Sequence, residues 1–218
     1  MKRILFLFLI TIALISENNA FAKEQISEYE LAVNTFQTQP KKAIHMLTKL
    51  AKKGNIDAQI DLYSIYRQGL STKKDSNKAI YWIKKAAQTN SEAMSILGSL
   101  YITQSNYKDG LKYLDKAAKK SNPTALYVLG AIYFDGTGVK QNCKRSTNDY
   151  LKAAKLGSVQ SSEYFLNAYL NGNKCLQKSK MDAKKWLKEA VNLNSPLALR
   201  LLGYSQLFPN NPYGIRKT

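Results

Sequence analysis

The chain has 218 residues, with 33 Lys and Arg side chains against 15 Asp and Glu, and its formal net charge is +18. This length is enough for one domain with a real core or for one uninterrupted repeat array. A charge of this size is typical of nucleic-acid-binding proteins, but the first residues argue against that class because they predict export.

The N-terminal segment has the order of parts found in a cleaved secretory signal. Two basic residues come first, followed by a twelve-residue apolar run at 4–15 and an Ala-Phe-Ala site at 20–22. A membrane span would need about 20 apolar residues, and no later run is long enough. We therefore expect residues 1–22 to be a cleaved signal peptide and the mature protein to be periplasmic or secreted.

The rest of the chain carries five copies of one amphipathic helix pattern. They begin at residues 42, 78, 109, 145 and 182, so the spacings are 36, 31, 36 and 37 residues. In the second copy, Ile80, Ile83 and Ala87 fall on one helix face, while Lys84 and Lys85 point elsewhere. A near-constant period of this length is typical of repeat proteins.

A second pattern lies between these copies. It reads "SILGSLYITQ" at 95–104 and "YVLGAIYFDGTGV" at 127–139, with a fainter copy, "RLLGYSQLF", at 200–208. A glycine inside a helix costs about 1 kcal/mol relative to alanine, so Gly98, Gly130 and Gly203 predict close approach of a neighbouring helix. The turns contain Gly, Ser, Asn and Pro in positions that suit helix caps. No strand pattern is present, and the predicted fold class is all-α.

These residues resemble the Sel-1-like repeat, a relative of the tetratricopeptide repeat. The family pattern is A-x-x-x-L-G-x-x-Y-x-x-G-x-G-V followed by K-A-x-x-W-x-x-K-A-A. The matching residues include Ala125, Leu129, Gly130, Tyr133, Gly136, Gly138 and Val139 in the first half, and Lys78, Ala79, Trp82, Lys85, Ala86 and Ala87 in the second. Tyr63 and Leu166 depart from it by replacing the family's glycine.

The resemblance covers about residues 42–207 and implies an α/α solenoid, a right-handed superhelix of about five helix hairpins. The helices with the Leu-Gly pair would line its concave face, and the Lys-Ala-Ala helices would lie outside. Residues 23–41 would then form an N-terminal capping helix region, and residues 208–218 a flexible C-terminal tail.

The two cysteines are expected to lie close together. Cys143 starts the fourth outer helix, and Cys175 follows the fourth inner helix. Antiparallel helices in a hairpin bring the start of one beside the end of the other, so both cysteines fall at one end of a single unit. In an oxidising compartment we expect them to form a structural disulfide; two buried free thiols are the alternative.

The resemblance implies a scaffold or inhibitor that binds another protein and uses no cofactor. Its sharper form is an immunity protein that neutralises a type VI secretion effector such as a lipase. The net charge, +17 once Lys2, Arg3 and Glu17 are removed, favours an acidic partner or an anionic envelope surface rather than nucleic acid. By analogy with tetratricopeptide repeats, the concave partner-binding positions are Ser95, Ile102, Tyr127, Phe134, Glu163, Asn167, Arg200 and Tyr204.

The alternative function is a cell-wall-related ligand binder, or an enzyme that binds or hydrolyses β-lactams. Ser71–Lys74 and Ser105–Lys108 match the Ser-x-x-Lys string of serine β-lactamases, but neither is accompanied by Ser-Asp-Asn or Lys-Thr-Gly. The single histidine, His45, lies on a basic outer helix, and the sequence contains no cluster of metal ligands. We therefore predict no catalytic residue, no metal and no cofactor.

Overall fold

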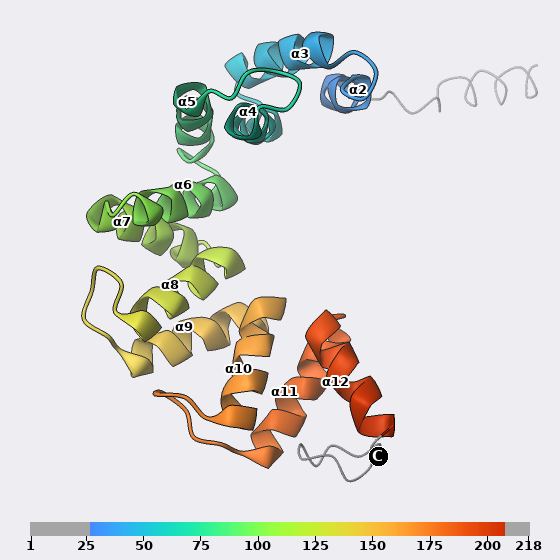
Figure 1. The fold of residues 1–218 in the computed structure, drawn as a ribbon. Coiled ribbons are helices and arrows are strands. Elements are labelled where there is room, and N and C mark those ends of the chain that lie inside the picture. The colour runs from blue at the N-terminus through green and yellow to red at the C-terminus, as the bar shows by residue number, and fades with distance from the viewer. Residues whose placement is uncertain (1–26, 208–218) are drawn as a thin grey trace, which may run out of the picture. The chain divides into compact units, whose positions relative to one another are not determined.

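The computed structural model describes residues 27–207 (Figure 1), so the expected signal peptide and the expected tail lie outside the described residues. The described chain consists of eleven helices joined by short turns and contains no strand. The prediction of an all-α fold is confirmed. None of the described helices is both long and apolar enough to cross a membrane.

The chain divides into two compact units between Asp75 and Ser76. The described part of the first unit contains α2 (Glu28–Thr35), α3 (Pro40–Lys52) and α4 (Ile56–Gln68). Ser27 caps α2: its hydroxyl accepts a hydrogen bond from the Glu30 amide, and the Glu30 carboxylate accepts one from the Ser27 amide. The buried side chains of this unit include Ala32, Ala43, Leu47, Ala58 and Leu62.

The second unit contains eight helices, each packed on the next along the chain. They are α5 (Ser76–Ala86), α6 (Ser91–Thr103), α7 (Tyr107–Lys119), α8 (Pro123–Asp135), α9 (Cys143–Lys155), α10 (Val159–Asn171), α11 (Lys180–Asn192) and α12 (Pro196–Leu207). The helices α6 and α8, which carry successive copies of the Leu-Gly pattern, also contact each other. Within this unit the hairpins therefore stack as a solenoid requires.

Side-chain caps fix where the helices of the second unit begin. The Asn122 Oδ1 accepts a hydrogen bond of 2.8 Å from the amide of Ala125 in the first turn of α8. The same role is played by Asn90, Asn106, Asn142, Ser158 and Ser179. Gly136 ends α8 in the left-handed conformation, with φ of 80°. The polar turn residues thus act as the caps that the sequence indicates.

Close helix crossings occur at two of the three glycines named from the sequence. A Cβ on Gly98 would lie 2.8 Å from the Leu114 side chain and 3.0 Å from the carbonyl oxygen of Gly110, a second glycine on the opposing helix. A Cβ on Gly130 would lie 2.8 Å from the Tyr150 ring. The expectation is wrong for Gly203, because among the described residues nothing lies within 4 Å of a Cβ placed there.

Larger side chains fill the next hairpin. Leu166 stands at the position of the family's glycine in α10 and is fully buried against Leu187, Ala190 and Ala198. In the same hairpin Trp186 stacks on Phe165, with ring centroids 4.4 Å apart. Alanines on the facing helices leave room for the leucine.

Arg145 joins three helices of the second unit. Its guanidinium forms ion pairs with Asp115 of α7 at 2.7 Å and with Asp149 of α9 at 3.5 Å. The same group lies over the Tyr133 ring of α8, 4.0 Å from its centroid. Burial raises the pKa of Asp149, and the charge of Arg145 opposes this effect. The contacts link consecutive hairpins through one side chain.

Candidate functional site

An open hollow of about 480 Å³ lies between α8 and α10. Its lining residues are Tyr127, Phe134, Gln160, Glu163, Tyr164, Asn167, Ala168, Asn171, Gly172 and Asn173. Four of the eight residues expected on the concave face therefore come together in one place. We call the hollow lined by these ten residues the α8–α10 hollow.

One face of α10 supplies most of the polar lining. Gln160, Glu163, Asn167 and Asn171 are spaced by three or four residues, so a helix presents them on one side. Asn167 is exposed and Glu163 is half-buried. The amides offer both donors and acceptors, whereas Glu163 is the one acidic residue of the lining. This side of the hollow can hydrogen-bond a ligand in several ways.

Aromatic rings form the other wall and continue into the core. The Tyr127 ring lies 5.6 Å from that of Tyr150, which stacks on Tyr164 at 3.9 Å. Phe134 meets Tyr164 edge to face, with centroids 5.8 Å apart. Burial raises the pKa of both the Tyr150 and the Tyr164 hydroxyl, so these groups are neutral at physiological pH. The rings give the hollow an aromatic, uncharged wall.

A hydrogen-bond chain from α12 holds the carboxylate of Glu163. The Ser195 hydroxyl donates to Glu163 Oε1 at 2.5 Å, and the same hydroxyl accepts from the Ala198 amide at 3.0 Å. Ser195 is buried and lies in the turn between α11 and α12. The turn between α11 and α12 thus holds in place the one carboxylate that lines the hollow.

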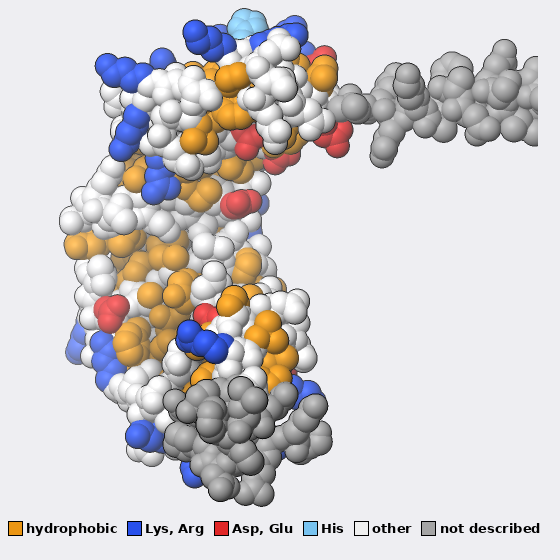
Figure 2. All heavy atoms as spheres, turned by 45° about the vertical axis from the view of Figure 1, so that its right-hand side comes forward, with side chains coloured by type: hydrophobic (Ala, Val, Ile, Leu, Met, Phe, Trp, Pro, Cys, Tyr) orange, Lys and Arg blue, Asp and Glu red, His pale blue; other side chains and the backbone are white. Residues whose placement is uncertain are grey.

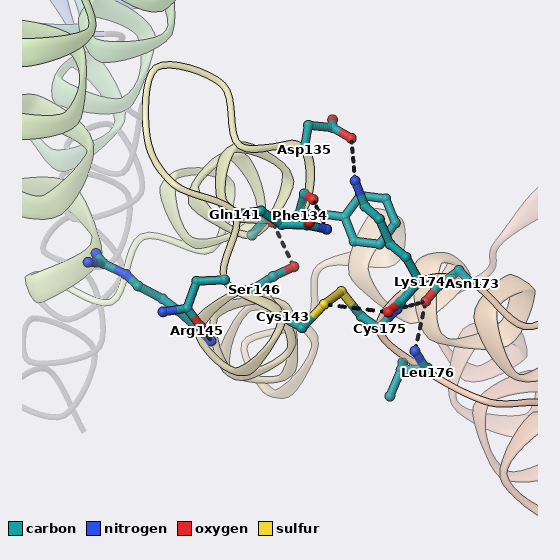
Figure 3. The surroundings of a disulfide bond; sticks show 12 residues. Phe134, Asp135, Gln141, Cys143, Arg145, Ser146, Asn173, Lys174, Cys175 and Leu176 are labelled. Atoms are coloured by element: carbon teal, nitrogen blue, oxygen red, sulfur yellow. Dashed lines mark hydrogen bonds and ion pairs between the residues drawn. A yellow bond between two sulfur atoms is a disulfide. The ribbon is translucent and has the colours of Figure 1, made fainter.

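The loop after α10 forms the rim, and a disulfide ties it to α9 (Figure 3). Cys143 and Cys175 are bonded, with Cα atoms 5.2 Å apart, as the sequence led us to expect. Asn173 Oδ1 accepts hydrogen bonds of 2.8 Å from the amides of Cys175 and Leu176. The disulfide therefore anchors the short loop in which Gly172 and Asn173 line the hollow.

The loop that forms the rim carries two basic residues, Lys174 and Lys178, and the stem of Lys178 lies beside Gly172, 3.3 Å from where a Cβ would be. The Lys174 amine lies 4.3 Å from the centroid of the Phe134 ring and 3.6 Å from the carboxylate of Asp135 (Figure 3). The Lys174 side chain is thus held beside one ring of the hollow while paired with an acid of its own.

The other expected site residues are not part of the hollow. Ser95 is wrong as a contact residue because it is buried, with 1% of its surface exposed. Ile102 is half-buried and packs against Gly110 at the helix crossing of its own hairpin. Arg200 is exposed on α12. Tyr204 falls on the same helix, but its side chain is outside the described part of the structure.

Sequence reasoning missed Gln160, Tyr164, Asn171 and Asn173. Gln160 and Asn171 lie three residues before Glu163 and four after Asn167, so the helical period alone would have found them. Asn173 depends on the loop conformation that the disulfide and its hydrogen bonds produce. Nothing in the sequence pattern marks it.

The catalytic candidates lie apart from the hollow. His45 is exposed on α3, Ser71 lies in the turn that follows α4, and Ser105 is exposed between α6 and α7. Across residues 27–207 no group of three or more His, Cys, Asp or Glu side chains could hold a metal ion.

Figure 2 shows Lys and Arg side chains spread over the face in view, with hydrophobic side chains gathered between them.

Comparison with solved structures gives the same architecture. A Sel1 repeat protein from Oxalobacter formigenes matches 90% of this chain over 88% of its own length, with 24% identity and a TM-score of 0.73. A protective antigen of uropathogenic Escherichia coli strains, which displays an SLR fold, matches 80% of the chain with 26% identity and a TM-score of 0.67. The match spans 40% of the length of that antigen.

More distant structures include an immunity protein from Pseudomonas aeruginosa, with 20% identity, a TM-score of 0.44, and coverage of 92% of this chain and 86% of that one. A likeness at this level carries no argument about function. No curated protein sequence matches the chain. The model of the Sel1 repeat matches residues 29–55, 57–90, 91–122, 123–158 and 164–195. These five matches cover more than half of the sequence, and the chain belongs to the Sel1 repeat family.

Proposed function

We propose that this protein binds another protein through the α8–α10 hollow and acts as a scaffold or inhibitor without chemistry of its own. The observation that carries the proposal is the meeting of Tyr127, Phe134, Glu163 and Asn167 in one open hollow. Half-buried tyrosine rings next to polar side chains are typical of binding anchors. Helix hairpins hold these groups in place before a partner arrives, which lowers the entropy lost on binding.

The finer form of the proposal is an exported immunity protein that inhibits a secreted effector such as a lipase. Its support is the signal-like segment at 1–22 and the high positive charge. The outer helices carry many of the basic side chains; α7, for example, presents Lys108, Lys112, Lys116 and Lys119 to solvent. Such a surface would attract an acidic enzyme and speed the encounter. An anionic envelope surface is the other target that this charge fits.

Affinity purification from a periplasmic extract tests the protein-binding function. The mature wild-type chain is compared with Asn167→Ala and with Asn148→Ala, which removes an exposed asparagine from α9 outside the hollow. We expect one protein to be retained by the wild type and by Asn148→Ala, and to be lost with Asn167→Ala. The melting temperatures of all three chains should agree.

Retention of the same protein by both variants would contradict the role of the hollow. A captured protein supports the immunity form only if the chain also inhibits its enzymatic activity in a direct assay. Association should also slow steeply with added salt if long-range attraction brings the partner in. Retention of cell-wall fragments with no protein would instead favour a ligand-binding role.

A further inference from the structure

The charge of the α8–α10 hollow is opposite to that of the whole chain. The chain has a net charge of +18, yet the hollow has no Lys or Arg among its described lining residues and one carboxylate, Glu163. Two lysines of the adjoining loop lie close by. Lys174 is engaged with Asp135 and with the Phe134 ring, and Lys178 is exposed, with its stem beside Gly172, but does not line the hollow. A ligand that enters the hollow therefore meets a negative group.

The carboxylate of Glu163 has unused binding capacity. An ionised carboxylate has two oxygens and about four acceptor sites, and the Ser195 hydroxyl occupies one of them. No Lys or Arg of residues 27–203 forms an ion pair with Glu163. Because Ser195 already holds the carboxylate and Glu163 lines the hollow, its remaining acceptor sites can bind a ligand without costly reorganisation.

The aromatic wall suits a cation for a second reason. The face of an aromatic ring attracts a positive charge placed within about 6 Å of its centroid. This chain already uses such contacts: the Lys174 amine lies 4.3 Å from the Phe134 centroid, and the Arg145 guanidinium lies 4.0 Å from that of Tyr133. Tyr127 lines the same hollow and is half-buried, with no cation over its ring among the described contacts.

The amides of α10 suit a peptide. Asn167 and Asn171 can each donate to a carbonyl and accept from an amide, so they match an extended backbone whatever its side chains are. An acidic side chain entering here would meet Glu163 without a lining cation to balance it. The combination of one fixed acid, aromatic rings and neutral amides is complementary to a basic side chain on a peptide segment.

We infer that the α8–α10 hollow takes up an Arg or Lys side chain from an extended segment of the partner protein. The inference rests on the proposed function and names the part of the partner that enters the site. It also separates two effects of charge. The net positive charge of this chain attracts an acidic partner surface at long range. The hollow, by contrast, selects one positively charged side chain of that partner.

Short capped peptides test this inference on the purified mature chain. The probes are Ac-Gly-Ser-Xaa-Ser-Gly-NH₂ with Arg, Lys, norleucine or Glu at Xaa, titrated at 150 mM salt and followed by shifts of the amide resonances in NMR. We expect the Arg and Lys probes to bind about tenfold more tightly than the Glu probe. Norleucine keeps the chain length without the charge and should bind about five- to tenfold more weakly than Lys.

Two variants locate the effect. Glu163→Gln keeps an acceptor for Ser195 and should weaken Arg binding about five- to tenfold, whereas Glu189→Gln, at an exposed position of α11, should leave it unchanged. If Glu163→Gln melts early, Tyr127→Leu provides a second removal of a cation contact. Equal binding of all four probes, binding by none, or no change with Glu163→Gln would overturn the inference.

The outcome is distinct from that of the purification experiment. Loss of the natural partner with Asn167→Ala, together with no preference for basic probes, would leave the protein-binding function standing without this selectivity. Selective binding of basic probes, with partner retention unaffected by Asn167→Ala, would confirm the cation site and reject the hollow as the protein-binding surface.

Discussion

At the residue scale, the glycine of the Leu-Gly pair has different surroundings in two copies of the repeat. Gly130 crosses α9 so closely that a Cβ would lie 2.8 Å from the Tyr150 ring, and its carbonyl accepts a 2.8 Å hydrogen bond from the Ser146 hydroxyl. Gly203 occupies the equivalent place in α12 but is exposed, with nothing described within 4 Å of a Cβ. The repeat therefore has glycine both at a position where a Cβ would clash with a neighbouring helix and at one where the described residues leave room for a Cβ.

Alanine at the two positions should therefore act in opposite directions. Gly130→Ala should lower the free energy of unfolding by about 1–3 kcal/mol, because the methyl group overlaps a buried ring. Gly203→Ala should raise it by up to about 1 kcal/mol, since alanine favours the helix and meets no obstacle. Urea unfolding measures both changes. Equal destabilisation would show that α12 packs as closely as α8.

At the element scale, the disulfide connects the start of α9 with the loop that forms the rim of the hollow. Residues 143 and 175 are 32 apart in sequence, and the link closes a loop that contains α9 and α10. Removing both thiols with Cys143→Ser and Cys175→Ser should lower the free energy of unfolding by about 3–4 kcal/mol on the chain-entropy estimate. Urea unfolding under oxidising conditions measures the loss.

Dithiothreitol provides the matched control. It should destabilise the wild type by a similar amount and leave the double variant unchanged. Mass spectrometry after alkylation without reductant should label neither cysteine of the purified wild type. Labelling of both would contradict the bond, and so would a wild type that is insensitive to the reductant.

The helix faces of α5 give a second test at this scale. Trp82 is buried, with 6% of its surface exposed, whereas Lys84 is exposed and its amine lies 5.9 Å from the Tyr101 ring centroid. Trp82→Ala should cost about 3–5 kcal/mol because it removes a large packed side chain. Lys84→Ala should stay within about 0.5 kcal/mol of wild type in the same thermal or urea unfolding experiment. Comparable losses would mean that the two faces are assigned the wrong way round.

The elements were predictable because their signal is local and repeated. The pattern at 109–118 lies inside α7 (Tyr107–Lys119), and its apolar positions, Leu114 and Ala117, are buried there. The contact between Gly98 and Gly110 was not predictable, because the pairing of two glycines on different helices depends on their crossing point. Periodicity says which face is buried, but it does not say which residues meet.

The candidate site was predictable only in part for the same reason. Of the partner-binding positions that a tetratricopeptide analogy gave, Tyr127, Phe134, Glu163 and Asn167 line one hollow. The same rule gave Ser95, which the second unit buries. In the shorter repeat at 91–122, α6 and α7 are joined by only three residues, and this hairpin lacks the longer loop that follows α8 and α10. The four expected positions that line the hollow lie in the two hairpins that keep the longer loop.

At the scale of the whole molecule, buried tyrosines make stability depend on alkaline pH. Burial is the main cause that raises the pKa of Tyr150, Tyr164 and Tyr169 in the second unit and of Tyr29 in the first. In the unfolded chain a tyrosine has a pKa of about 10. Because the folded pKa is the higher one, these groups contribute their full stability below about pH 10, and the contribution is lost as the pH rises toward the folded value.

The free energy of unfolding should therefore fall above about pH 10, by up to about 1.4 kcal/mol per pH unit for each such tyrosine. Tyr150→Phe removes one of these groups and should reduce the slope by up to that amount, although loss of its hydroxyl also changes the absolute stability. Tyr81→Phe is the matched control, because Tyr81 is 52% exposed. Urea unfolding at intervals between pH 8 and pH 11 measures the slopes.

Absorbance at 295 nm should show some of the 14 tyrosines ionising only when the chain unfolds. A single ionisation step near pH 10 in the folded protein, or equal slopes for both variants, would mean that water reaches the aromatic wall of the hollow and that burial does not raise the pKa values of its tyrosines.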